Sequence, residues 1–261
     1  MDKNEELMSW NEIVKTITKY NAPLYDLHTH SINKYTDKFL NGKVPPSRQV
    51  IEAAEKLGLA FVAISDHSYE IVNYPDLPEP TIINKTLNSF IPYIEYLENV
   101  KRSLKIPLLK GVEFYIDKPE HLSKLSKEAI NGLDYIILET RTKLNFTEVR
   151  KALGNATLIL AHPTIESFFN ENTKTEEMAK WVDSLKENKI HFELNRSNLK
   201  EYLARPEFYK RFFDIAKAKD IKFTIGSDYH QIPGDYIKFY TNVCKVIKLY
   251  ELNNFYKPNK V

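Results

Sequence analysis

Histidine and acidic side chains stand in short groups at widely separated places along the chain. His28 and His30 are two residues apart, and so are Asp228 and His230. In an extended chain, residues two apart point to the same face, so the members of each pair can converge. Imidazole and carboxylate are the ligands of zinc, manganese and iron when thiolates are absent. The sequence therefore predicts a divalent-metal site.

Most histidines follow short apolar runs. Five of the seven do so, namely His28, His30, His67, His162 and His230. A single histidine in such a place is usually a hydrogen-bonded core residue, but repetition at four separate run ends favours metal ligands. His121 and His191 lie elsewhere, and for them we expect a structural role.

The apolar runs themselves are four to seven residues long, which suits strands buried on both faces of a parallel sheet. They are residues 24–27, 59–64, 108–114, 135–138, 157–161, 190–194 and 222–225. Amphipathic segments with helical spacing separate them, for example 46–57 and 174–188. An opening helix is expected within residues 1–20 and a closing helix over 236–258.

Alternating strands and helices without a break in composition predict one α/β domain over residues 1–261. A TIM-like barrel is favoured over a doubly wound sheet, because no glycine-rich phosphate turn follows the first run. In a barrel of this kind the carboxyl ends of the strands form the mouth, where the candidate ligands would meet.

The composition of the chain argues against several classes of partner and site. The chain has 261 residues, with 37 Lys and Arg against 35 Asp and Glu, so no nucleic-acid or membrane partner is expected. The single cysteine, Cys244, excludes a disulfide framework and thiolate zinc sites, and we expect it to be a core residue. No signal-peptide-like or membrane-spanning run is evident, so a cytoplasmic location is expected.

In this order, the motifs resemble those of the PHP superfamily, the polymerase and histidinol phosphatase group of metal-dependent phosphoesterases. They are His-x-His at 28–30, Asp-His at 66–67, Gly-x-Glu at 111–113, His-Pro at 162–163 and Gly-Ser-Asp-x-His at 226–230. The resemblance implies a distorted (β/α)7 barrel holding two or three divalent ions of Zn, Mn or Fe, and hydrolysis of a small phosphorylated substrate. The metal ligands it implies are His28, His30, His67, Glu113, His162, Asp228 and His230, with Glu113 bridging.

Two positions depart from the family pattern. Asp37 resembles a further family ligand, but two extra residues precede its motif. Arg141 stands where the family usually has a histidine, and a guanidinium cannot bind a metal. One interpretation is that Arg141 binds a phosphate oxygen. The other is that the centre holds fewer metal ions, unless Glu139 supplies an oxygen ligand instead. Arg196 is a second candidate for binding phosphate.

Other roles and functions stay open at this point. Asp66 or Asp26 could orient a ligand imidazole from behind the metal site. The main prediction is a phosphomonoesterase. The alternatives are a specific histidinol phosphatase, a 3′-end nuclease, and a degenerate domain that binds without turnover. The sequence names neither the substrate, the native metal, the general acid nor the oligomeric state.

Overall fold

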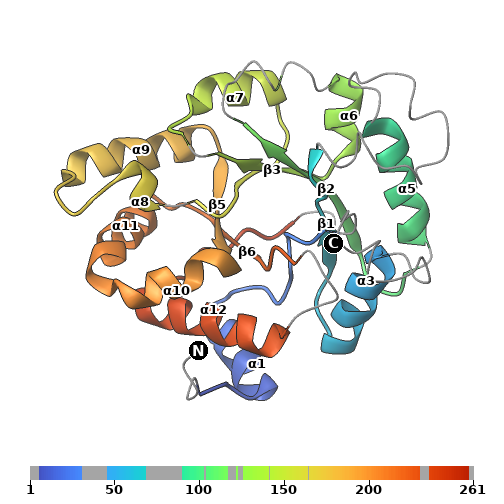
Figure 1. The fold of residues 1–261 in the computed structure, drawn as a ribbon, viewed down its shortest axis with the longest axis horizontal. Coiled ribbons are helices and arrows are strands. Elements are labelled where there is room, and N and C mark those ends of the chain that lie inside the picture. The colour runs from blue at the N-terminus through green and yellow to red at the C-terminus, as the bar shows by residue number, and fades with distance from the viewer. Residues whose placement is uncertain are drawn as a thin grey trace.

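Six parallel strands form one sheet in the order in which they occur along the chain (Figure 1). The strands are β1 (Val62–Ile64), β2 (Leu108–Tyr115), β3 (Tyr135–Glu139), β4 (Leu158–Leu160), β5 (Ile190–Asn195) and β6 (Phe223–Gly226). In this computed structural model the described residues are 6–30, 46–68, 90–102, 104–116, 122, 126–140, 142–163, 165–229 and 235–258.

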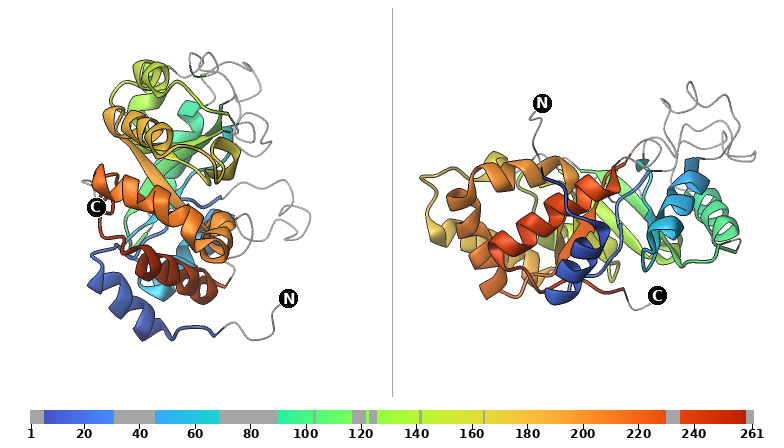
Figure 2. Two further views of the ribbon diagram at one scale, coloured as in Figure 1. Left: turned by 90° about the vertical axis from the view of Figure 1, so that its left-hand side faces the viewer. Right: turned by 90° about the horizontal axis from the view of Figure 1, so that it is seen from below.

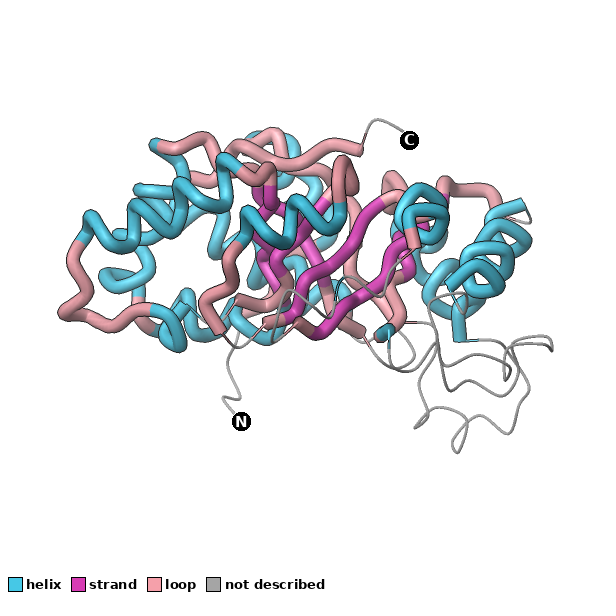
Figure 3. The backbone as a smooth tube through the Cα atoms, turned by 90° about the horizontal axis from the view of Figure 1, so that it is seen from above, coloured by secondary structure: helices cyan, strands magenta, loops and turns pink. Residues whose placement is uncertain are grey.

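Helices surround the sheet. Figure 1 shows them as an outer ring, and Figure 3 shows the strands passing between helical layers. They are α1 (Trp10–Lys19), α3 (Pro46–Leu57), α5 (Phe90–Arg102), α6 (Lys127–Gly132), α7 (Phe146–Leu153), α8 (Ile165–Phe168), α9 (Thr175–Glu187), α10 (Arg196–Ala204), α11 (Pro206–Ala218) and α12 (Tyr236–Tyr250). The arrangement is one α/β domain with a curled sheet.

The first expected strand, residues 24–27, is replaced by isolated bridges between the two edges of the sheet. Toward β6, the amide of Leu27 donates to the carbonyl of Ile225 over 2.9 Å. Toward β1, the amide of Ala63 donates to the carbonyl of Asp26 over 3.2 Å. The segment that carries His28 and His30 therefore lies between the first and last strands.

The predicted helix faces are buried. On α9, Met178, Trp181, Val182 and Leu185 all point into the core, as their spacing predicts. The N-terminal helix α1 begins with a capping box, in which Ser9 and Glu12 each bond the other's backbone amide. It packs beside α12 (Figure 2). There the rings of Trp10 and Tyr240 meet edge to face. Cys244 of α12 is buried, as expected of a core residue.

The closing helix is shorter than the predicted 236–258. It ends at Tyr250, and the following residue, Glu251, adopts a left-handed conformation with φ of 53°. Beyond it the chain extends along the sheet, with Phe255 bridged to Phe223 of β6. The apolar pattern continues past the helix because these residues still pack on the core. Among the described residues, no helix has the length and apolar character that crossing a bilayer requires.

Candidate metal centre

The predicted ligands gather at the carboxyl ends of the strands. His28 and His30 lie on the bridging segment, and His67 follows β1. Glu113 lies inside β2 and is bridged to His67, which sets these two side by side. His162 follows β4 and Asp228 follows β6. Residues from five separate segments thus meet at one end of the sheet.

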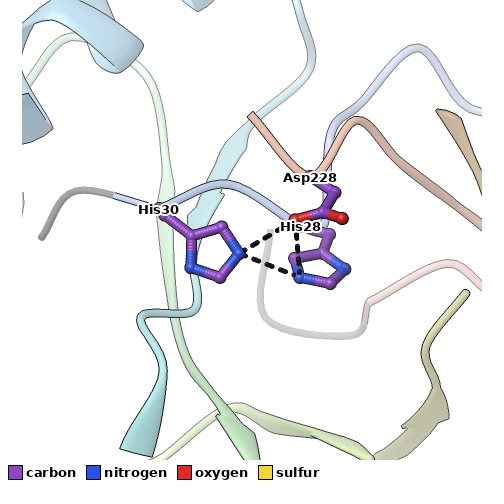
Figure 4. Close-up of side chains that lie close together, drawn as sticks. All are labelled: His28, His30 and Asp228. Atoms are coloured by element: carbon purple, nitrogen blue, oxygen red, sulfur yellow. Dashed lines mark hydrogen bonds and ion pairs between the residues drawn. The ribbon is translucent and has the colours of Figure 1, made fainter. Parts of the chain in front are cut away.

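A first group consists of His28, His30 and Asp228, which face one another in Figure 4. The two Nε2 atoms of the histidines are 3.1 Å apart. Oδ1 of Asp228 lies 3.2 Å from Nε2 of His30 and 3.7 Å from Nε2 of His28. Three ligand-type atoms therefore surround one small volume, as binding of a single cation requires.

Glu113 lies at the centre of a second group. Its Oε2 atom is 2.8 Å from Nδ1 of His67, 3.3 Å from Nε2 of His28 and 3.4 Å from Nε2 of His30. Within the described part of the chain, this buried oxygen makes no hydrogen bond of good geometry. A buried carboxylate oxygen facing three imidazole nitrogens needs positive charge between them. The donor set fits a divalent ion.

A third group extends the centre toward β3. Oε1 of Glu113 is 3.0 Å from Nε2 of His162. Glu139, at the end of β3, completes a set whose ligand atoms all lie within 4.8 Å of one another. The three groups overlap, because His30 belongs to the first and second and Glu113 to the second and third. Glu113 is therefore the residue that the second and third groups share.

Two of these residues hold unusual backbone conformations. His162 has a φ of 24° and Asp228 a φ of 53°, in the region that side-chain-bearing residues rarely adopt. Each is held by a hydrogen bond from its amide: His162 donates to Oε2 of Glu193 over 2.9 Å, and Asp228 donates to the carbonyl of His28 over 2.7 Å. Such strain typically persists where a functional side chain must be aimed.

The electrostatics favour bound positive charge. Burial alone would lower the pKa of His28, but the carboxylates of Glu193, Glu113 and Asp228 outweigh it and hold this pKa well above the ordinary value. Burial would likewise raise the pKa of Glu113, yet the charge of His28 and the hydrogen bond from His162 hold it well below the ordinary value. A divalent ion bound here would be stabilised by the same carboxylates.

Asp26 has a different role from the one expected. Its carboxylate contacts no imidazole among the described residues and holds backbone instead. Oδ1 accepts hydrogen bonds from the amides of His28 over 3.2 Å and Ser227 over 2.9 Å. Oδ2 accepts one from the hydroxyl of Tyr236 over 3.0 Å. Burial raises the pKa of Asp26 to about 6, against these hydrogen bonds, which lower it. Asp26 thus joins the two segments that carry His28 and Asp228.

Asp66 and Arg196 lie beside the centre. Oδ2 of buried Asp66 accepts a hydrogen bond from the Tyr93 hydroxyl over 3.0 Å. Arg196 donates from Nε to the carbonyl of Ser227 over 3.0 Å, and its guanidinium lies over the ring of Tyr229. Arg196 therefore supports the loop that bears Asp228. Its predicted contact with phosphate, like the orienting role of Asp66, stays a prediction.

Glu193 on β5 is a buried residue that the sequence interpretation missed. Its Oε1 atom lies 2.9 Å from Nδ1 of His28. The available signal was a carboxylate inside an apolar run, since a charged side chain in a strand covered on both faces needs a specific partner. Three other predicted site residues, Asp37, Arg141 and His230, lie outside the described residues.

Comparisons with known proteins concern the fold. No protein-family model and no curated protein sequence matches the chain. Among solved structures, histidinol phosphate phosphatase from Lactococcus lactis, in complex with zinc, L-histidinol and phosphate, aligns with 16% identity and a TM-score of 0.55. The alignment covers 89% of this chain and 94% of that protein. The chain shares that protein's fold.

A second solved structure has the same fold. A protein assigned as a histidinol phosphatase from Listeria monocytogenes aligns with 15% identity and a TM-score of 0.50, over 80% of this chain and 96% of that one. At such low identities the likeness describes the arrangement of strands and helices. It shows that the chain shares the fold of these two proteins.

Proposed function

We propose that the protein is a metal-dependent hydrolase that cleaves a small phosphomonoester. The observation that carries this proposal is the overlap of three ligand groups through His30 and Glu113. Overlap places neighbouring candidate sites within reach of one substrate group. Divalent ions in such a centre supply charge that neutralises a phosphate and lower the pKa of water to near neutrality.

The residues of this chain would divide the work as follows. His28, His30 and Asp228 would hold one ion. Glu113 would contribute to the two other candidate positions, one with His30 and His67 and one with Glu139 and His162. Glu139 with His162 would complete a third position, where the family's histidine is replaced by Arg141. Asp37 and His230 are proposed as additional ligands. The number of ions, two or three, and their identity as Zn, Mn or Fe belong to the proposal.

Arg141 and Arg196 are proposed to hold phosphate oxygens. A guanidinium presents paired donors that match two oxygens of a phosphate, and it keeps its charge at every working pH. Asp66 is proposed to orient His67, its neighbour in the chain. We further propose that residues 24–30 act as a seventh β unit that closes the curled sheet into a (β/α)7 barrel, because they bond both β1 and β6.

Metal content and turnover test the proposal together. We expect purified protein to bind two or more equivalents of Zn, Mn or Fe and to hydrolyse p-nitrophenyl phosphate, with loss of activity on chelation and recovery on adding metal. Protein with neither bound metal nor turnover would indicate the degenerate domain. Preference for single-stranded DNA over small phosphomonoesters would indicate the nuclease.

A narrower candidate is histidinol phosphate as the substrate. The observation that favours it is that both structural relatives carry a histidinol phosphatase name, and one was solved with L-histidinol and phosphate. The test compares kcat/KM for histidinol phosphate with values for other small phosphomonoesters. A preference of less than about tenfold, or about 1.4 kcal/mol, would argue against a dedicated histidinol phosphatase.

A further inference from the structure

The buried carboxylate of Glu193 contacts the back of the His28 ring. Oε1 of Glu193 lies 2.9 Å from Nδ1 of His28, and both side chains are almost completely inaccessible. The opposite nitrogen of that ring, Nε2, faces His30 and Asp228 (Figure 4). One ring nitrogen thus faces the protein interior and the other faces the candidate metal centre.

The second oxygen of Glu193 is committed to two donors. Oε2 accepts a hydrogen bond from the backbone amide of His162 over 2.9 Å and one from Nδ2 of Asn195 over 3.0 Å. Asn195 is itself held as the cap of α10, because its Oδ1 accepts from the amide of Ser197. An ionised carboxylate only accepts hydrogen bonds, so its neighbours must donate.

The space for this carboxylate exists only because residue 226 is glycine. A Cβ built on Gly226 would lie 1.9 Å from Oε1 of Glu193 and 2.6 Å from Cβ of His28. Oε1 ends a side chain, but the Glu193 carboxylate is buried and hydrogen-bonded, and Cβ of His28 is attached directly to the backbone, so neither atom can move away without breaking contacts. The backbone of β6 therefore approaches the Glu193–His28 pair as closely as atoms allow.

We propose that Glu193 is a positioning residue that selects the tautomer of His28: the proton sits on Nδ1 and the lone pair of Nε2 faces the metal centre. The inference rests on the proposed metal-dependent function. Through Oε2, the same carboxylate holds the amide of His162, so one buried side chain orders two candidate ligands from different segments.

Glu193→Gln tests this because an amide offers one acceptor where the carboxylate offers two. The amide oxygen is needed opposite the His162 amide and Asn195, both of which are donors. The amide NH2 then faces Nδ1 of His28, and the ring must carry its proton on Nε2, where metal would bind. We expect the affinity for zinc to fall about 10- to 100-fold, the usual effect of losing such an outer partner.

Two variants serve as controls. Glu193→Asp keeps an acceptor-only group and should retain the Nδ1–H tautomer, with zinc affinity closer to wild type than that of the Gln variant. Glu187→Gln makes the same chemical change at an exposed position of α9 and should leave zinc affinity unchanged. Zinc affinity is measured by chelator competition on metal-stripped protein, with thermal unfolding of each stripped variant recorded alongside.

The tautomer is read directly from the ring-nitrogen NMR shifts of His28 in stripped, 15N-labelled protein, recorded at the high-pH end of a titration, where the ring carries a single proton. The wild-type spectrum should show the proton on Nδ1, and the Gln variant should show it on Nε2. Wild-type protein with the proton on Nε2 overturns the inference even if the Gln variant does not fold, and so does a folded Gln variant with unchanged tautomer and zinc affinity. Failure of wild-type protein to bind zinc would instead contradict the proposed function, which separates the two claims.

Discussion

His28 and His30 approach each other through their Nε2 atoms, 3.1 Å apart, with Oδ1 of Asp228 within 3.7 Å of both. The two imidazole nitrogens and the carboxylate form one candidate ligand group. Replacement of His28 or Asp228 by Ala should remove at least one metal equivalent and reduce phosphatase activity by several orders of magnitude. Far-UV circular dichroism should remain close to that of wild type.

A matched control is Asp214→Ala. Asp214 is a partly exposed residue that pairs with Lys210 and Lys217 on α11, and such surface pairs contribute roughly 0–1 kcal/mol. Its removal should change neither metal content nor activity. Full phosphatase activity in the His28 or Asp228 variant would eliminate the metal-centre mechanism.

Glu113 and Glu139 should differ in how much metal each controls. Glu113 belongs to two ligand groups and Glu139 to one. We expect Glu113→Gln to lower the metal stoichiometry by more than one equivalent and Glu139→Gln by one at most, as measured by elemental analysis after gel filtration. Equal losses in the two variants would contradict the bridging role of Glu113.

Gly226→Ala should disrupt the centre without altering any charge. The added methyl group would overlap the Glu193 carboxylate and the His28 side chain, and overpacking of this kind typically costs about 1–3 kcal/mol. We expect lower thermal stability and weaker zinc binding. Gly132→Ala on α6 is the comparison, since its methyl group would meet mainly the movable Cδ1 of Ile94 and should be tolerated better.

His191 should make stability depend on pH. Burial, with Lys222 and Arg150 nearby, lowers the pKa of His191 from 6.5 to about 4, so the folded protein keeps the ring neutral. Above pH 6.5 this contribution is fully present. As the pH falls toward 4, the unfolded chain gains a proton that the folded protein does not, and the free energy of unfolding decreases by up to about 1.4 kcal/mol per pH unit.

The measurement compares urea unfolding of wild-type protein with that of His191→Phe at pH 7 and pH 5. The ring of His191 stacks on that of Tyr256, with 4.4 Å between the ring centroids. Phenylalanine keeps a ring in this place but cannot be protonated. The loss of stability between the two pH values should therefore be smaller in the variant. The same loss in both proteins would show that His191 contributes nothing to it.

Much of the fold could be predicted because the later strands are short runs of mainly apolar residues. The runs at 108–114 and 190–194 correspond to β2 and β5, and the helix expected over 46–57 has those bounds in the structure. The first run failed as a strand for a physical reason. Backbone hydrogen bonds join residue 24 to 60, 26 to 63 and 29 to 65. The offset between the bonded residues changes along the segment, so the pairing loses its register and no continuous ladder forms.

The site was predictable only where ligand chemistry is visible in local spacing. The His-x-His at 28–30 and the Asp228 motif indicate ligands because two-residue spacing orients neighbouring side chains alike. The partner of Asp26 could not be predicted in this way, because spacing does not reveal whether a carboxylate reaches a ring or a backbone amide. Glu193 was missed because its contact with His28 joins residues 165 apart in sequence.

The carboxylate of Asp26 also bears on how the pocket comes to exist. It bonds Ser227 and Tyr236, which lie 201 and 210 residues further along the chain. Bringing such distant segments together costs loop-closure entropy and slows folding. During synthesis, this part of the pocket can take its final form only after α12 has left the ribosome. A chain truncated before Tyr236 should therefore lack an ordered centre even though all of the candidate ligands are already present.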